Sequence, residues 1–183
     1  MWKLIFYATF AHSNSKKHTD MRKIIVLLVV AFTFHIGIYA QKSDPSGIIQ
    51  NDGLFYTDLS QTKLYTGEYK EYYADGSLRL QMYIKDGKPE GDYIIYYSNG
   101  KPNEIRSYHD GKFNGTWRTY NEAGILISEA VYSNDKKHGT WHVWDDNGIM
   151  RYEMHYNMGQ KTGKWYMWDE KGKLISEKDY SAH

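Results

Sequence analysis

Bulky apolar residues recur along this chain at a fixed spacing from residue 67 onward. In each of five units of 24 residues, an aromatic residue stands two positions after a glycine, at Tyr69, Tyr93, Trp117, Trp141 and Trp165. A second aromatic column lies at Tyr72, Tyr96, Tyr120, Trp144 and Trp168, and a late column at Ile84, Tyr108, Tyr132, Tyr156 and Tyr180. Such a period is typical of a repeat array, in which each unit buries its apolar residues against its neighbours.

Turn residues divide each unit into two strands. One cluster ends at the mid-unit glycine, as in Asp146-Asn147-Gly148, and another closes the unit, as in Asp110-Gly111. The intervals are rich in Tyr, Trp, Ile and Val, which favour strands, and none shows the apolar spacing of a helix. The sequence therefore predicts an all-β fold, an elongated antiparallel sheet of tandem 24-residue β-hairpin repeats over residues 67–183, the last repeat being truncated.

The type of mid-unit turn decides which side chains share a face. A two-residue type I′ turn needs positive φ at two positions, which does not suit Ala123-Gly124, so a three-residue loop with a glycine bulge is expected. This register places the second aromatic column opposite Leu78, Pro102, Leu126, Met150 and Leu174, together with the late column, on a packed face. The opposite face becomes the candidate binding face. Its residues are Tyr69, Tyr93, Trp117, Trp141 and Trp165, paired with Gln81, Ile105, Glu129, Glu153 and Glu177.

The candidate binding face has simpler interpretations as well. With two strands per unit, Glu129, Glu153 and Glu177 would lie ~10 Å apart, too far for strong coupling of their titrations. They can equally be solvated strand residues, and the aromatic column can be half-buried packing on a single-layer sheet.

The first forty residues have a different pattern. Met21-Arg22-Lys23 precedes an apolar run from Ile24 to Ile38, and Ala40 precedes Gln41. This pattern predicts a secretory signal peptide over 21–40, with cleavage after Ala40, because the run is shorter than the ~20 residues of a spanning helix. An uncleaved anchor is the alternative. Residues 1–20 are expected to be an over-extended, disordered start. Residues 41–66 are expected to form a linker and an N-terminal capping partial repeat, and no membrane span is expected after cleavage.

Charge and composition exclude several kinds of chemistry. Without residues 1–40, 18 of the 23 Lys and Arg and 21 of the 22 Asp and Glu remain, which is a net charge of 18 − 21 = −3. This balance argues against nucleic acid as a partner. The chain has no cysteine, and His138 and His142 flank a turn and a strand start rather than sharing a helical face. No catalytic residue, metal site or cofactor is expected.

The repeated pattern G-x-[YW]-x-x-[YW]-x-x-x-G-x-L, followed by E-x-x-Y-x-x-G-K, resembles the MORN repeat variant of bacterial exported and antitoxin-like proteins. The resemblance covers residues 67–183, with Pro102 in the leucine column and Asp135 in a glycine position as departures. It implies an elongated antiparallel sheet with binding or scaffolding roles and no shared catalytic residues.

These observations predict a non-catalytic exported module that binds or scaffolds a protein or peptide partner. Antitoxin-like neutralisation of that partner is a special case. The final strand, Ile175 to Tyr180, would leave an edge open to an added strand. The alternative is a cell-envelope glycan-binding protein that stacks sugars on the Trp/Tyr column, for which glycoside hydrolysis is disfavoured by the carboxylate spacing. The sequence leaves the oligomeric state open.

Overall fold

The computed structural model describes residues 47–181, which form an all-β structure. The strands are β1 (Ile49–Asn51), β2 (Leu54–Tyr56), β3 (Gly67–Tyr72), β4 (Leu78–Lys85), β5 (Lys88–Tyr96), β6 (Pro102–His109), β7 (Lys112–Tyr120), β8 (Leu126–Ser133), β9 (Lys136–Trp144), β10 (Met150–Asn157), β11 (Gln160–Trp168) and β12 (Leu174–Asp179). The expected signal peptide and the residues before it lie outside the described part of the chain.

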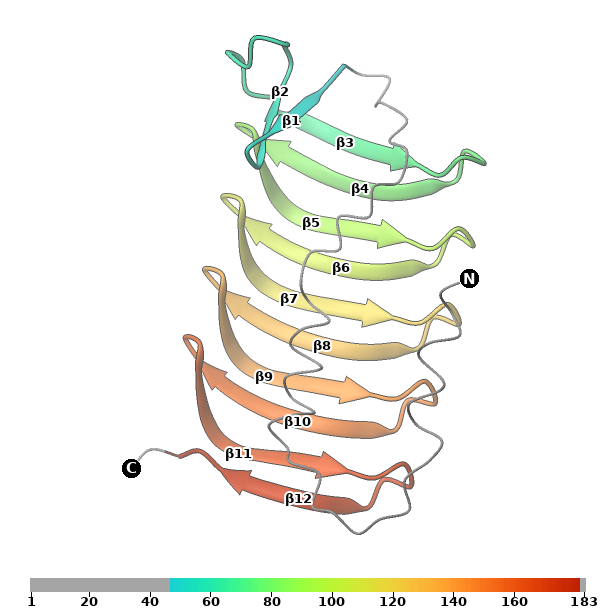
Figure 1. Ribbon diagram of the computed structural model, residues 1–183, viewed down its shortest axis with the longest axis vertical. Coiled ribbons are helices and arrows are strands. Elements are labelled where there is room, and N and C mark those ends of the chain that lie inside the picture. The colour runs from blue at the N-terminus through green and yellow to red at the C-terminus, as the bar shows by residue number, and fades with distance from the viewer. Residues whose placement is uncertain (1–46, 182–183) are drawn as a thin grey trace. The chain divides into compact units, whose positions relative to one another are not determined.

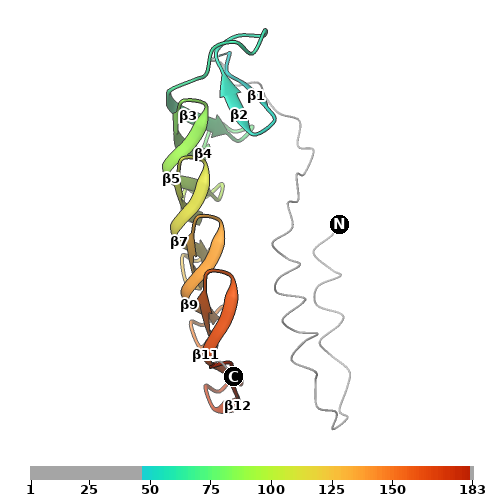
Figure 2. The ribbon, with the colours of Figure 1, turned by 90° about the vertical axis from the view of Figure 1, so that its left-hand side faces the viewer.

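Strands β3 to β12 form one ten-stranded antiparallel sheet in sequence order (Figure 1). Each repeat contributes one hairpin, so the array grows by two strands per 24 residues. Seen from the side, these strands form a single layer (Figure 2). The expected elongated sheet of hairpin repeats is therefore confirmed.

The turns inside the hairpins have the expected three-residue form. In each repeat the mid-unit glycine donates its N–H to the carbonyl three residues earlier, as from Gly148 to Asp145 at 2.9 Å, and its φ is positive, 79° at Gly148. The Asp145 carboxylate accepts the N–H groups of Asn147 and Ile149 at 2.9 and 3.0 Å, which lowers its pKa. The predicted pairs on either side of the turn, such as Trp144 with Met150, are all present.

The turns between repeats are two-residue turns with positive φ at both positions. Met158 and Gly159 have φ values of 48° and 94°, and Asn134 and Asp135 have 48° and 64°. This is the type I′ geometry that matches the twist of the flanking strands. Asn and Asp tolerate this conformation, which explains how the third repeat closes without a glycine.

Two bulges in each repeat set the faces of the sheet. In the second strand, one residue just past the turn has no partner: Met150 pairs with Trp144, but Tyr152 pairs with Val143, so Arg151 is the extra residue. Between repeats, the three residues Gly139 to Trp141 of β9 lie opposite the single residue Ala130 of β8. In repeats two to five the leading glycine thus sits in a bulge with positive φ, 65° at Gly139. This geometry explains why the glycine recurs.

The bulge past the turn reverses the predicted faces. It shifts the pairing by one residue, so Trp141 pairs with Met154 and not with Glu153. The same correction applies to the other predicted pairs: Tyr69 pairs with Met82, Tyr93 with Arg106, Trp117 with Ala130, and Trp165 with Lys178. A one-residue slip moves every following side chain to the other side of a sheet. The Trp/Tyr column and the glutamates therefore occupy opposite faces.

The face that carries the Trp/Tyr column is the buried one, and we name it the packed face. Tyr69, Trp117, Trp141 and Trp165 are only 5, 9, 7 and 3% exposed, whereas Tyr72, predicted to be packed, is 49% exposed. The late column lies on the packed face too, because its residues pair with the leading glycines, as Tyr132 does with Gly115. From Trp117 to Tyr180 the rings of the two columns alternate, with neighbouring centroids 4.7 to 5.5 Å apart. Phe113, which belongs to neither column, lies 5.0 Å from both Trp117 and Tyr108 and so connects this row of rings to the first repeats.

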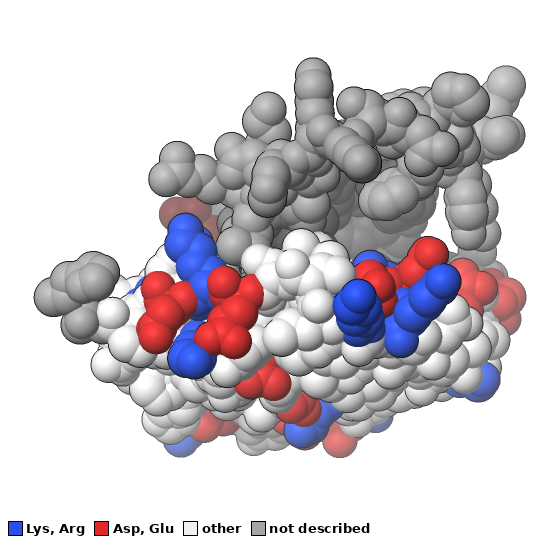
Figure 3. Space-filling view, turned by 90° about the horizontal axis from the view of Figure 1, so that it is seen from below, with Lys and Arg blue, Asp and Glu red and all other residues white. Residues whose placement is uncertain are grey.

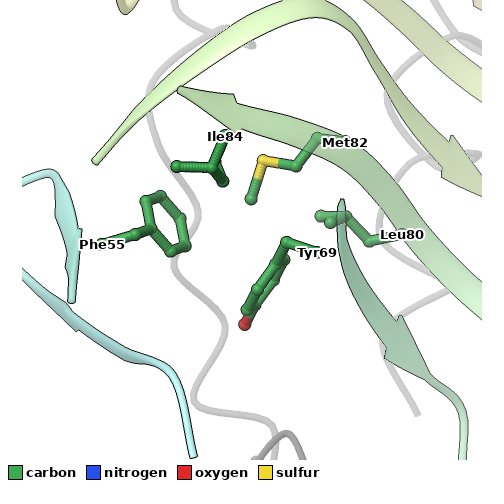
Figure 4. Packing of buried hydrophobic residues seen from close by; sticks show 5 residues of the cluster. All are labelled: Phe55, Tyr69, Leu80, Met82 and Ile84. Carbon is green, nitrogen blue, oxygen red and sulfur yellow. The ribbon is translucent and has the colours of Figure 1, made fainter. Parts of the chain in front are cut away.

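The β3 end of the packed face is covered by the β1–β2 hairpin. Phe55 of β2 packs edge-on against Tyr69, with ring centroids 5.1 Å apart. Together with Leu80, Met82 and Ile84, these two residues form a buried cluster (Figure 4). The backbone N–H of Phe55 also donates to the carbonyl of Gly87 at 2.9 Å. The hairpin thus closes one end of the array.

Candidate functional site

The face opposite the packed face carries a row of side chains that lie directly across from one another on adjacent strands. In repeats three to five the row consists of Arg118, Glu129, His142, Glu153, Tyr166 and Glu177. We name this side of the sheet the charged face. In repeats one and two the same row is Lys70, Gln81, Ile94 and Ile105. Charge is therefore concentrated toward the β12 end of the row.

Each glutamate of the row has a basic partner on a neighbouring strand. The Glu129 carboxylate accepts a hydrogen bond from Arg118 Nε at 2.8 Å, and Glu177 accepts one from Lys164 Nζ at 2.8 Å. The latter contact raises the pKa of Lys164. Because these pairs are part-exposed, their contribution to stability is small, and their main effect is to place opposite charges side by side on adjacent strands.

Two imidazoles approach the central carboxylate. The Nε2 atoms of His142 and His155 lie 3.7 and 3.2 Å from the two oxygens of Glu153. The other ring nitrogen of His155 lies 3.1 Å from the Thr140 hydroxyl, which fixes the orientation of that ring. Within residues 47–181, no group of three or more His, Cys, Asp or Glu side chains is arranged to hold a metal ion. The cluster thus places two imidazoles beside one carboxylate on the charged face.

Half-exposed tryptophans flank the row on its turn side. The Trp144 ring lies 5.4 Å from the His142 ring, and the Trp168 ring lies 5.8 Å from the Tyr166 ring, both at shallow tilts. These two tryptophans belong to the second aromatic column, whose members were expected to be packed. They lie two strands apart, which is ~10 Å.

The spacing of the glutamates limits what acid–base chemistry the row can perform. Glu129 and Glu153 both pair across from His142, and Glu153 and Glu177 both pair across from Tyr166, so consecutive carboxylates lie two strands apart. This places them ~10 Å from each other, beyond the ~5 to 9.5 Å of glycosidase carboxylate pairs. The spacing of the glutamates therefore does not match that of a glycosidase carboxylate pair.

The structure divides the residues predicted for the binding face. Glu129, Glu153 and Glu177 lie on the charged face, while Tyr69, Tyr93, Trp117, Trp141 and Trp165 lie on the packed face. Sequence reasoning missed the neighbours of the glutamates: Arg118, His142, His155, Tyr166, Trp144 and Trp168. The pairing of Arg118 and His142 with Glu129 follows from the sequence once the bulge after the turn is counted as one unpaired residue.

A cation lies over aromatic rings of the packed face in repeats two to five. Lys137 Nζ is 4.5 Å from the Trp141 ring centroid, and Lys161 Nζ is 4.4 Å from that of Trp165. Burial, and then repulsion from Lys161, lowers the pKa of Lys137. Arg106 occupies the corresponding space over Trp117, at 4.4 Å. These cations cover the rings that were predicted to be a stacking platform.

The hairpin, its bulges and the aromatic columns recur as one unit, and a known family has the same unit. The profile of the MORN repeat variant matches residues 65–86, 89–110, 113–134, 137–158 and 161–182. The chain belongs to the MORN repeat variant family. None of the curated proteins compared with the chain matches it.

Each matched MORN repeat starts two residues before a leading glycine and so includes the bulge, the first strand, the turn and the second strand. The positions that build the packed face are similar in all five MORN repeats. The charged row, in contrast, changes from repeat to repeat: Arg118, His142 and Tyr166 occupy equivalent positions. The repeat thus accounts for the scaffold, and the charged row is what distinguishes one repeat from another. The described residues include no helix long and apolar enough to cross a membrane.

Proposed function

We propose that this MORN repeat protein is an exported, non-catalytic module that binds a protein or peptide partner through its charged face. The observation that carries this proposal is the cross-strand row from Arg118 to Glu177, flanked by the half-exposed rings of Trp144 and Trp168. Binding hot spots are enriched in Trp, Tyr and Arg, and all three occur here on one rigid sheet.

The chemistry of the row indicates the class of partner. The charged face carries fixed charges of both signs, with Arg118 paired to Glu129 and Lys164 paired to Glu177, and the chain from residue 41 onward has a net charge of −3 from 18 Lys and Arg against 21 Asp and Glu. A polyanion would be repelled by the glutamates. A protein surface with its own pattern of both signs would complement the row. Neutralisation of a toxic partner would be one use of such an interface.

The binding proposal is tested by pull-down from the periplasmic or secreted fraction, using three versions of the chain. We expect the variant with Arg118→Ala, His142→Ala and Tyr166→Ala to lose the proteins that the unchanged chain retains. A matched control changes Lys70 and Gln81, which occupy the same row in the first repeat, and should retain them. Equal recovery with all three versions would refute the charged face as the binding surface.

Export is proposed from the segment over residues 21–40. If the segment is cleaved after Ala40, N-terminal sequencing of the protein from cells should begin at Gln41. Recovery of the chain with residues 21–40 still attached, in the membrane fraction, would contradict this part of the proposal.

Glycan binding is the second candidate, because Trp144 and Trp168 present half-exposed rings ~10 Å apart beside polar side chains. This pair replaces the buried column of Trp117, Trp141 and Trp165 as the stacking platform. A glycan array probed with the chain should then give signals that the double variant Trp144→Ser, Trp168→Ser loses. No signal on the array would leave the protein partner as the only candidate.

A further inference from the structure

We propose that the outer edge of β12 accepts an extended strand from another protein, with the sequence character of the first strand of a repeat. Among residues 47–181, only β11 pairs with β12. The N–H of Tyr180 donates to Gly163 of β11 at 2.7 Å. Because hydrogen bonding alternates along an antiparallel strand, the backbone groups of Ile175 and Glu177 point away from β11. The edge site uses the backbone of β12, whose Glu177 side chain also ends the charged row, and the inference does not depend on the function proposed above.

The array itself contains four examples of the proposed complex. At every boundary between repeats, the second strand of one repeat pairs with the first strand of the next, as β10 does with β11. β12 is the second strand of the fifth repeat and has the same backbone register toward β11 as β10 has toward β9. An added strand on β12 would therefore continue a geometry that the chain already uses.

The internal boundaries define what the added strand should carry. An aromatic residue two positions after a glycine packs on the late tyrosine of the preceding strand: Trp141 lies 5.1 Å from Tyr132, and Trp165 lies 5.1 Å from Tyr156. Tyr180 is the late tyrosine of the last repeat, and it contacts Trp165 at 4.7 Å on the other side. The packed face thus supplies a ring on which a further aromatic residue can stack.

The indole N–H adds a directional contact. Trp141 Nε1 donates to the Val131 carbonyl at 2.9 Å, and Trp165 Nε1 donates to the His155 carbonyl at 3.0 Å. The equivalent carbonyl in β12 belongs to Asp179. A carbonyl oxygen has two lone pairs, so it can accept an indole whatever else it contacts. The partner strand is therefore of the form basic–x–Gly–x–Trp, the basic residue corresponding to Lys137 and Lys161.

A second copy of this chain fits the edge less well than another protein does. Head-to-tail addition would place β3 of the second copy on β12. In that second copy Phe55 already packs on Tyr69, with ring centroids 5.1 Å apart, and so takes the place that Tyr180 of the first copy would need. Antiparallel pairing of β12 with itself about Glu177 sets two glutamates opposite each other, and pairing about Lys178 sets two lysines opposite each other.

The β12 end of the molecule presents exposed charged and apolar side chains to an added strand. Acidic and basic side chains border an uncharged area in the view from this end (Figure 3). β12 carries the acidic residues Glu177 and Asp179 and the basic residue Lys178, and Glu177 is paired with Lys164 at 2.8 Å. Its apolar residues Leu174 and Ile175 are 45 and 53% exposed. Apolar contact and charged groups of both signs are thus available together along one edge strand.

The test uses a labelled synthetic peptide with the sequence of residues 160–169, added to the whole chain and followed by fluorescence anisotropy. We expect saturable binding. A peptide with serine in place of its first tryptophan should bind at least about tenfold more weakly, since the stacked ring and the indole hydrogen bond are both lost. A peptide N-methylated at the residue corresponding to Tyr166, which pairs with β10 in the array, should not bind.

Substitutions in the protein locate the binding. Glu177→Pro removes an outward N–H without removing a bond to β11, and it should abolish peptide binding while circular dichroism is unchanged. The matched variant Glu177→Ala keeps the N–H and should bind within about threefold. The Arg118, His142 and Tyr166 triple variant should bind the peptide like the unchanged chain, which separates this site from the charged face.

Three results would overturn the inference. Equal binding of the tryptophan and serine peptides would show that the edge does not recognise the aromatic residue two positions after the glycine. Binding that persists in Glu177→Pro, or with the N-methylated peptide, would place the peptide elsewhere. A dimer of the unchanged chain in sedimentation velocity that Glu177→Pro converts to monomer would assign the edge to a second copy.

Discussion

Replacing Trp141 by alanine should destabilise the array far more than replacing its neighbour Trp144 on the same strand. The two side chains belong to different columns, and the structure places them on opposite faces of β9. Trp141 is 7% exposed, lies between the rings of Tyr132 and Tyr156 at 5.1 Å each, and donates its indole N–H to the Val131 carbonyl at 2.9 Å. Trp144 is half-buried and pairs with Met150 next to the turn.

The size of the effect follows from these contacts. Truncation of a buried Trp or Phe to alanine typically costs about 3–5 kcal/mol, because the removed area is lost and the surrounding residues close only part of the cavity. Among residues 47–181 the sheet is a single layer, so no second layer of described side chains can fill the space that the indole leaves. We expect Trp141→Ala to fall in this range. Trp144→Ala should cost about 1 kcal/mol, as for a partly exposed side chain outside the core.

Urea unfolding, followed by far-ultraviolet circular dichroism, measures both changes under one set of conditions. Trp141→Phe serves as the control for the indole hydrogen bond. Loss of that bond should destabilise the array by about 1 kcal/mol, and the smaller ring should destabilise it further. A larger loss for Trp144→Ala than for Trp141→Ala would show that the face assignment, and with it the position of the charged face, is inverted.

Three further predictions concern the repeat, its turns and its tyrosines. Deletion of residues 115–138, one full period, should leave a shorter folded array, whereas a twelve-residue deletion should unfold it; circular dichroism and size-exclusion chromatography distinguish the two outcomes. Gly148→Ala should cost about 1–2 kcal/mol in urea unfolding, because φ there is 79°, and Gly148→Asn should cost less; equal losses would refute the role of backbone strain. Burial raises the pKa of Tyr132 and Tyr156 to about 12. Their contribution to stability is therefore complete below their ordinary pKa of 10.0 and is lost as the pH rises through 12, so Tyr132→Phe should shift alkaline unfolding to higher pH in a pH titration.

The repeat period and the turn chemistry were sufficient to predict the architecture. The glycine spacing gives the hairpin unit, and the unsuitability of Ala123-Gly124 for a type I′ turn selects the three-residue loop that all five repeats contain. These features are local, since a turn of this kind depends on the φ preferences of only a few residues.

The faces could not be predicted in the same way, because they depend on how many residues a bulge leaves unpaired. Arg151 is the unpaired residue in the fourth repeat, and counting it as paired places Trp141 beside Glu153 instead of Met154. The error is one residue in length but exchanges the two faces entirely. The site was therefore predicted in part: the glutamates are on the exposed side, and the aromatic column that was expected beside them is in the core.

The orientation of the strands has a consequence for how the array would respond to mechanical tension. The strands cross the long axis of the sheet, so their backbone hydrogen bonds run nearly parallel to that axis (Figure 1). The β1–β2 hairpin lies at one end of this stack and β12 at the other. A pull between the two ends would load few hydrogen bonds at a time and would peel off one hairpin after another. Each repeat of 24 residues would release about 80 Å of chain at low force. Such an array would behave as an extensible tether that lengthens in equal steps.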